Sequence, residues 1–416
     1  MVRISPFRAL RYDPARAGEL SCAVSPPYDV IDAPHQERLY AASPYNIVRL
    51  TLGRQSPTDT DDDNRYTRAR RDYDAWCRQG ILRQDAAPAL YAIEHAFTPP
   101  PLTDPVGVRR TRLGIIAVLD LDDGVEGVLK HEQTLAGPKE DRTRLLEAVP
   151  ANLEPIFCVY PDAVGGMQRQ LAAACQVPPT AATTLGTEGV RLWVIQDTNF
   201  IAAFKQHLTS LPVLIADGHH RFEVGFANRE RCRGLMVYFV SMADPALVVH
   251  PIHRLLDRAP GPQALGSVCE VEPVADGPAA LDWVLGQGAK QGSFGYCEGG
   301  TAYRVRVRPE ARERWVVGSG QPSDLARLDV SVLHGLLFPA MGVSSEQVRY
   351  TGNPSEVWAA LRSGSAKAAW LLREIPLAIV YKLAEAGHVM PPKSTYFYPK
   401  VPSGLTINPF VDVPVR

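Results

Sequence analysis

The chain has 416 residues, more than one ordinary hydrophobic core accommodates, so we expect two domains. Hydrophobic residues make up 45% and charged residues 21%, which is the composition of a globular protein. The formal net charge is -1, from 44 basic and 45 acidic side chains. This balance argues against a protein that coats nucleic acid through its phosphates, so nucleic-acid partners are not expected.

The cysteines and the N-terminus indicate the compartment. Seven cysteines are scattered and never form a CxxC pair, which is typical neither of a disulfide framework nor of a zinc site. Reduced thiols indicate the cytoplasm. The first residues lack the apolar segment of a signal peptide, and no apolar run approaches the roughly 20 residues that span a bilayer. We therefore expect a cytoplasmic protein with no membrane partner.

The first hundred residues combine short apolar stretches with one long amphipathic segment. Residues 25–31 indicate a rigid turn followed by a helix start, and residues 45–52 alternate like a strand. Residues 65–82 predict an amphipathic helix with Tyr66, Tyr73 and Trp76 on its apolar side. Further along the chain, strands are predicted at 89–97, 112–121, 155–160 and 190–196, and a helix at 200–208.

The sharpest local pattern lies in the middle of the chain. Residues 211–216 form an apolar strand, Asp217-Gly218-His219-His220-Arg221 a polar turn, residues 222–233 a helix and residues 235–242 a further strand. This order of strand, turn, helix and strand is the framework on which α/β proteins place ligands at strand ends.

The composition changes after residue 255. Residues 260–320 are rich in glycine and alanine, residues 328–341 predict a helix, and residues 358–372 a helix and then a strand. The segment 391–400 cannot be a regular helix. We therefore expect an α/β domain over 1–255, which carries the polar turn at 217–221, and an α/β subdomain over 256–416. The Lys-Ser-Thr loop of this subdomain is expected to return to the polar turn.

The polar turn is a natural anion site. Free backbone N–H groups and the helix dipole favour negative charge there, Gly218 allows close approach, and Arg221 can hold a phosphate with two hydrogen bonds. Asp217 could bind Mg²⁺ or accept a proton. The alternative is that Asp217 is only an N-cap and the histidines are surface residues. Four adjacent reactive side chains favour a functional site.

Two further clusters carry charge. Beside His131 and Glu132, cations at Lys139 and Arg142 stand near a helix start, where acids are preferred, so a bound anion would compensate them. A solvated charge run explains this cluster equally well. The loop at Lys393 and the following Ser394 could contact phosphate, although packing as a C-terminal strand is the stronger interpretation.

One more carboxylate stands at a turn that prolines make rigid. Asp29 follows Pro27 and Tyr28, so its side chain could be held firmly, but an aspartate at such a position is usually a helix cap.

Six blocks in order along the chain together resemble the family called domain of unknown function 1015. They are SPPYDV at 25–30, HEQT at 131–134, GPKEDR at 137–142, ADGHHRFE at 216–223, PIHR at 251–254 and PPKSTYFYPK at 391–400.

The resemblance implies a fold and an activity. Members of this family are similar to free serine kinases, which share a ParB/sulfiredoxin-like fold and convert free L-serine to O-phosphoserine. Some members are thought to use pyrophosphate as donor. The implied fold is an α/β (α+β) ParB/sulfiredoxin-like core with a second C-terminal α/β subdomain. The turn that includes Gly218 and Arg221 would hold phosphate, whereas the identity of the base does not carry over.

At this turn the sequence differs from two related groups of proteins, and the differences argue against their activities. Sulfiredoxins have a cysteine where this chain has His219, which excludes thiol-based repair at this turn. ParB-like nucleotide switches usually show Gly-Glu-Arg-Arg at the turn and carry a DNA-binding module downstream, and neither pattern occurs here.

The sequence-based prediction is therefore a phosphotransferase that acts on free serine with Mg²⁺ as cofactor. Pyrophosphate is the expected donor rather than a nucleotide, since the chain has no GxxxxGK[ST] loop and no kinase-type glycine-rich loop. The alternative is a non-catalytic regulatory protein that binds phosphate or a nucleotide. The predicted catalytic residues are Asp217, His219, His220, Asp29 and Glu132, with Asp217 also the metal ligand. The predicted phosphate-binding residues are Gly218, Arg221, His131, Lys139, Arg142, Lys393 and Ser394.

Overall fold

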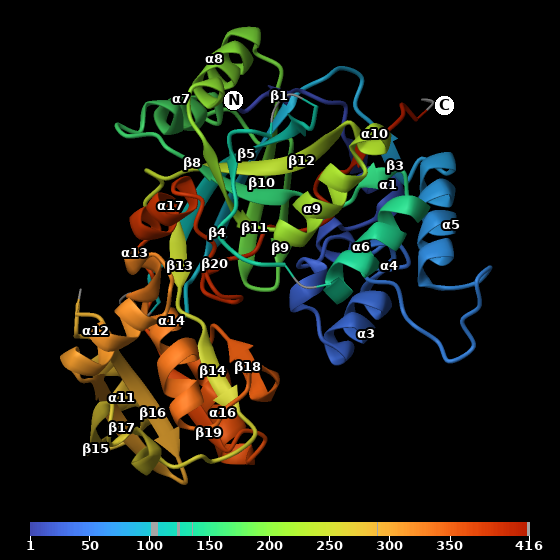
Figure 1. The fold of residues 1–416 in the computed structure, drawn as a ribbon. Helices are drawn as coiled ribbons and strands as arrows, with labels where there is room; N and C mark the ends of the chain where they lie inside the picture. Colours follow the sequence, from blue (N-terminus) through green and yellow to red (C-terminus); the bar gives the residue numbers. More distant parts are fainter. Residues whose placement is uncertain (101–106, 123–124, 135, 289, 414–416) are drawn as a thin grey trace.

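A nine-stranded mixed sheet forms the centre of the first 241 residues in the computed structural model, which describes residues 1–100, 107–122, 125–134, 136–288 and 290–413 (Figure 1). Its strand order is β6-β11-β8-β12-β5-β4-β10-β9, with β1 beside β5. The strands are β1 (Ile4–Ser5), β4 (Leu90–Phe97), β5 (Arg110–Asp120), β6 (Val128–Leu129), β8 (Ile156–Tyr160), β9 (Ala181–Leu185), β10 (Glu188–Ile195), β11 (Val213–Asp217) and β12 (Gly234–Ser241). The chain is thus a mixed α/β protein, as predicted.

The central strands are buried on both faces. All residues of β8 and β12 are buried, which matches their continuous apolar sequence. The helices α7 (Gly166–Ala174) and α8 (Thr198–Thr209) cover one face, where Phe204 packs with Phe239 of β12 (Figure 1). This packing places the carboxyl end of β11 at the edge of a rigid layer.

A helical layer lies beside the first sheet. It contains α3 (Ala33–Ala42), α4 (Val48–Thr51), α5 (Arg65–Arg78) and α6 (Ala136–Ala148) (Figure 1). Tyr66, Tyr73 and Trp76 of α5 are buried, so the predicted apolar face of this helix is confirmed. The helix α6 packs on α9 (His219–Ala227), which brings the two basic clusters of the sequence close together.

A second sheet of six antiparallel strands follows. Its order is β15-β17-β16-β19-β14-β18. The strands are β14 (His253–Leu256), β15 (Cys269–Val274), β16 (Ser293–Glu298), β17 (Thr301–Val307), β18 (Val348–Thr351) and β19 (Ala368–Leu371). The helices α11 (Gly277–Leu285) and α16 (Pro354–Ser363) pack on this sheet through Leu281 and Val357.

The remaining helices, strands and single helical turns connect these layers. The helices are α1 (Pro14–Ala17), α2 (Leu20–Ala23), α10 (Arg229–Cys232), α12 (Pro309–Gly318), α13 (Ser323–Ala326), α14 (Asp329–Val332), α15 (Phe338–Ala340) and α17 (Leu377–Glu385). The other strands are β2 (Leu10–Tyr12), β3 (Leu82–Gln84), β7 (Ala151–Asn152), β13 (Val248–His250), β20 (Tyr396–Tyr398) and β21 (Asn408–Pro409). The single turns are Tyr28–Val30, Pro262–Leu265, Leu333–Leu337 and Ser345–Gln347.

The C-terminal segment returns to the first sheet. The strand β20 pairs with β13, and β21 pairs with β7. Arg112 of β5 is fully buried and donates hydrogen bonds to the carbonyls of Tyr398 (3.2 Å) and Pro399 (2.8 Å). The loop after β20 is therefore fastened to the middle of the first sheet.

Most predicted elements are confirmed, but residues 45–52 are not a strand. They contain the helix α4, and the amide of Asn46 explains why. Its Nδ2 donates to the carbonyls of Cys22 and Val24, while its Oδ1 accepts from the N–H of Val48. This local bond between side chain and backbone favours a helical turn over the short alternation of the sequence. Residues 328–341 are helical but contain a π-helical turn at Leu333–Leu337.

The expected division at residue 255 falls inside β14, and the last two strands form separate two-stranded sheets with β13 and β7. The division into two independent domains stays a prediction. All seven cysteines are free thiols. Within the described residues, no helix is both long and apolar enough to cross a membrane.

Candidate active site

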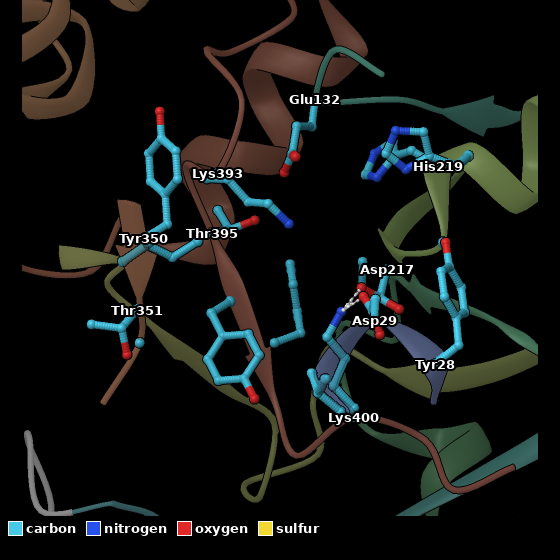
Figure 2. A pocket seen from close by; sticks show the side chains of 18 of the residues that line it. Tyr28, Asp29, Glu132, Asp217, His219, Tyr350, Thr351, Lys393, Thr395 and Lys400 are labelled. Carbon is cyan, nitrogen blue, oxygen red and sulfur yellow. Dashed lines mark hydrogen bonds and ion pairs between the residues drawn. The ribbon is translucent and has the colours of Figure 1, made fainter. Parts of the chain in front are cut away.

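A cavity of about 400 Å³ is lined by residues of both sheets and of the returning C-terminal segment (Figure 2). Its wall is strongly polar. The polar lining residues are Tyr28, Asp29, Glu132, Asp217, His219, His220, Arg221, Tyr350, Thr351, Asn353, Glu356, Lys393, Thr395, Tyr396 and Lys400, together with Gly218.

The turn after β11 supplies the floor of the cavity. Gly218 has a φ of 94° and is the N-cap of α9, so the side chain of Asp217 does not cap this helix. A Cβ atom at position 218 would lie 3.1 Å from the guanidinium of Arg221, and the left-handed φ favours glycine as well. Residues 218–221 at the start of α9 line the cavity. The first N–H groups of a helix have no partner within the helix itself.

Lys400 joins two carboxylates at this floor. Its Nζ contacts Oδ2 of Asp29 at 2.8 Å and also Oδ1 of Asp217 (Figure 2). Oδ2 of Asp217 accepts a hydrogen bond from Arg221 at 2.7 Å. Both oxygens of Asp217 are therefore bound to cations, whereas the ion pairs of Asp29 use a single oxygen.

These contacts determine the protonation states of Asp217 and Lys400. Burial by itself would raise the pKa of Asp217, but the charges of Lys400 and Arg221 outweigh it and hold that pKa below its ordinary value. Burial would lower the pKa of Lys400, but Asp217 and Asp29 hold it well above its ordinary value. Asp217 is thus a carboxylate and Lys400 an ammonium at neutral pH.

Two neutral histidines form the wall behind the turn. The rings of His131 and His219 meet edge to face with centroids 4.6 Å apart, and the backbone N–H of His131 faces Nε2 of His219 at 3.5 Å. Nε2 of His131 contacts Oγ1 of Thr395 at 2.9 Å. Burial lowers the pKa of His131 to about 4 and that of His219 well below its ordinary value. Burial also lowers the pKa of His220, on the cavity side.

We expect this buried pair to make the protein sensitive to mild acid. The folded pKa of His131, about 4, is below its ordinary value of 6.5, so the unfolded chain binds the proton first. Stability is complete above pH 6.5 and falls as the pH is lowered toward 4, by up to about 1.4 kcal/mol per pH unit and histidine. The measurement is urea unfolding at several pH values for the wild type and for His131→Gln. Equal slopes in the two proteins would contradict the assignment.

Glu132 and Lys393 lie on another side of the cavity (Figure 2). Glu132 forms a β-bridge with Met390, and the N–H of Met390 donates to the carbonyl of His131 at 2.9 Å. Burial raises the pKa of Glu132, and the charge of Lys393 opposes this shift. Lys393 has a φ of 59°, which is unusual for a residue other than glycine.

Four residues with predicted roles do not line the cavity. His131 lies behind His219, and Oγ of Ser394 donates to the carbonyl of Pro391 at 2.6 Å. Lys139 contacts Glu223 at 3.2 Å. Arg142 contacts Asp141 and donates to the carbonyl of Thr51 at 3.0 Å. The cations of α6 are thus compensated by neighbouring groups of the protein itself.

The sequence analysis did not single out several residues of the wall. Tyr350, Thr351, Asn353 and Glu356 come from β18 and the start of α16 in the second sheet. Lys400 ends the basic and aromatic segment 391–400, and that composition was the one available signal for it. The residues from β18 and α16 have no comparable motif.

Fold and site together define an α/β protein with a charged cavity at a strand–glycine–helix turn. The model of the family described as protein of unknown function (DUF1015) matches residues 4–331, and the chain belongs to this family. No curated protein matches the chain.

Several solved structures are similar in fold. A free serine kinase in complex with AMP is 13% identical, with a TM-score of 0.34 over 68% of this chain and 89% of that one. A conserved hypothetical protein from Pyrococcus furiosus is 14% identical, with a TM-score of 0.34 over 71% and 95%. A C-terminally truncated SbnI from Staphylococcus aureus is 8% identical, with a TM-score of 0.38 over 70% and 87%. All three TM-scores are below 0.5, so the function is argued from the site alone.

Proposed function

We propose that the protein is a phosphotransferase that transfers a phosphoryl group from pyrophosphate to the hydroxyl group of free L-serine. The cavity of about 400 Å³ at the N-terminus of α9 is the observation that carries this proposal. Its lining combines the N-terminus of α9 with Arg221, Lys393 and Lys400, which suits an anion of high charge. Phosphoryl transfer requires mainly positioning and charge neutralisation of this kind.

The mixed charge of the wall supports an amino acid as acceptor. The lining carboxylates are Asp29, Glu132, Asp217 and Glu356, and the lining cations are Arg221, Lys393 and Lys400. A cavity for an anion alone would need few carboxylates, whereas a zwitterion needs groups of both signs.

In the proposed reaction, the serine hydroxyl oxygen attacks one phosphorus of pyrophosphate. The bond to the bridging oxygen breaks, inorganic phosphate leaves, and the hydroxyl proton moves to a carboxylate. Asp29 is the best placed base, because both oxygens of Asp217 are bound to Lys400 and Arg221.

Magnesium fits this cavity as a cofactor that the phosphates bring with them. The described residues contain no group of three or more His, Cys, Asp or Glu side chains that could hold a metal. Mg²⁺ usually keeps several waters and takes one or two carboxylates together with phosphate oxygens. Asp217, the metal ligand predicted from the sequence, would supply such an oxygen only by giving up its bond to Lys400 or Arg221. The dication would neutralise the charge that pyrophosphate adds to four lining carboxylates.

We expect O-phosphoserine to form when the full chain is incubated with L-serine, Mg²⁺ and pyrophosphate. The measurement is mass detection of the product over a panel of pyrophosphate, ADP, ATP and polyphosphate. Product formed from ATP or ADP but not from pyrophosphate would identify a nucleotide as the donor and would leave the proposed phosphotransferase activity intact. No product from any donor, with a measurable affinity for pyrophosphate or ADP, would support the alternative below.

The alternative is a regulatory protein that binds phosphate or a nucleotide without turnover. Lys400 favours it, because this ammonium already neutralises Asp29 and Asp217, the two carboxylates closest to the helix N-terminus. A base that is held in an ion pair accepts a proton less readily.

A further inference from the structure

The charged groups of the cavity fall into two sets. Asp29, Asp217, Arg221 and Lys400 form ion pairs with one another. In contrast, no ion pair within 4.0 Å is found for Glu132 or Lys393 among the described residues, and the carboxylate of Glu132 is stabilised instead by the charge and the backbone N–H of Lys393. Glu132 is half-buried, whereas Lys393 is exposed. A half-buried carboxylate without an ion pair costs free energy, and a bound cation would compensate it.

Lys393 is held in place by its main chain. Its positive φ of 59° is shared by only one other non-glycine residue in the described chain, Arg233. Such a conformation is unfavourable for a residue other than glycine and persists only where the surroundings enforce it. Here Arg254, a fully buried residue of β14, donates from Nη2 to the carbonyl oxygen of Lys393 at 3.0 Å. The side chain of Lys393 points into the cavity (Figure 2).

Glu132 is fixed from the other side. Its bridge to Met390 ties it to the same returning segment, three residues before Lys393. Figure 2 shows the carboxylate of Glu132 and the ammonium of Lys393 pointing into the cavity that Asp29 and Asp217 also line. The two groups present opposite charges to one bound molecule.

We propose that Glu132 and Lys393 form the subsite for the α-ammonium and the α-carboxylate of a free amino acid. This inference rests on the proposed function, and it names the groups that would select its acceptor. The ammonium of the substrate pairs with Glu132 and its carboxylate with Lys393, so the side-chain hydroxyl is left to face Asp29 and the start of α9. The sequence had grouped Lys393 with phosphate and Glu132 with the catalytic residues.

The test is calorimetric binding of L-serine and of pyrophosphate, measured separately on the full chain. We expect Lys393→Met and Glu132→Gln each to weaken L-serine binding by at least about tenfold and to change pyrophosphate binding by less than about threefold. Lys393→Arg keeps the charge and should retain serine binding. Lys382→Met, on the exposed pair with Asp324, is the matched control and should bind both ligands as the wild type does.

The wild type supplies a further comparison. 2-Aminoethanol lacks the carboxylate and 3-hydroxypropanoate lacks the ammonium, so each should bind at least about tenfold more weakly than L-serine. Serine binding that survives both substitutions, or a loss confined to pyrophosphate, would overturn the subsite and leave the proposed function intact. A wild type that binds pyrophosphate but not L-serine would overturn the proposed acceptor and the subsite together.

Discussion

Replacing Lys400 by methionine is expected to abolish serine phosphorylation and to destabilise the fold. Lys400 is the ammonium that holds Asp29 and Asp217 together at the floor of the cavity. Without it, two carboxylates face each other across a partly buried space, and Asp217 keeps only Arg221 as its partner. Removal of one member of a buried ion pair costs about 3–5 kcal/mol. The exposure of Asp29 lowers this expectation to about 3 kcal/mol of unfolding free energy.

The pH dependence of this loss follows from the two pKa shifts. The raised pKa of Lys400 gives stability that is complete below its ordinary value of 10.5 and is lost as the pH rises through the folded value. The lowered pKa of Asp217 gives stability that is complete above 3.8 and is lost as the pH falls through the folded value. The difference between wild type and Lys400→Met should therefore be largest between pH 4 and 10 and should shrink below that window.

Urea unfolding at pH 7 and near pH 3, together with turnover at pH 7, measures these effects. Lys382→Met removes a lysine of an exposed ion pair and should alter neither quantity noticeably. We expect turnover in Lys400→Met to fall by at least about 100-fold, since the carboxylates lose their positions. A variant as stable as the wild type at pH 7, or a deficit that is unchanged near pH 3, would contradict the role assigned to Lys400.

The part of the site that could be predicted from the sequence is the part that is local in the chain. The strand, the glycine turn and the start of α9 are adjacent, so periodicity and the turn residues suffice to place Asp217 at a strand end. The same holds for the apolar face of α5. The prediction for residues 45–52 was wrong. They form a helical turn, at whose start Asn46 accepts from the N–H of Val48 while its Nδ2 is held by carbonyls more than 20 positions away.

The groups that complete the site are distant in sequence. Lys400 contacts Asp29 across 371 positions and Asp217 across 183. These contacts depend on the return of the C-terminal segment over the first sheet, which no local pattern reports. For the cations of α6, the sequence left two interpretations open. Their spacing indicated an anion or a solvated surface, whereas Arg142 is buried and bound to Asp141 and to a backbone carbonyl.

Replacement of Arg254 by methionine is expected to change activity much more than stability. It is fully buried, and it makes no ion pair with any described residue. Its donors reach His334 at 3.3 Å, the carbonyl of Ile252 and the carbonyl of Lys393. Burial lowers the pKa of Arg254 to about 10, which shows that its charge is poorly compensated. Removing this side chain ends the cost of burying an unpaired charge, which offsets part of the hydrogen bonding that is lost with it.

The same side chain is nevertheless coupled to the cavity. Arg254 holds the strained main chain of Lys393, and its guanidinium lies 5.4 Å from the ring centre of Tyr350 in the wall. With Arg254→Met, Lys393 loses the donor that fixes its carbonyl. A displacement of about 1 Å at a positioning group can lower a rate 100-fold. We therefore expect the KM for L-serine to rise strongly, while the KM for pyrophosphate and the midpoint of thermal unfolding change little.

Steady-state kinetics with each substrate varied in turn, combined with thermal unfolding, tests this expectation. Arg258→Met is the matched control: this exposed arginine lies four residues further along and donates to the carbonyls of Gly342 and Met341, outside the cavity wall. It should leave both KM values unchanged. An unaltered KM for serine in Arg254→Met would show that Arg254 does not position Lys393. A parallel rise of both KM values with a lower unfolding midpoint would mean that Arg254 supports the fold as a whole, since a structural role affects both substrates alike.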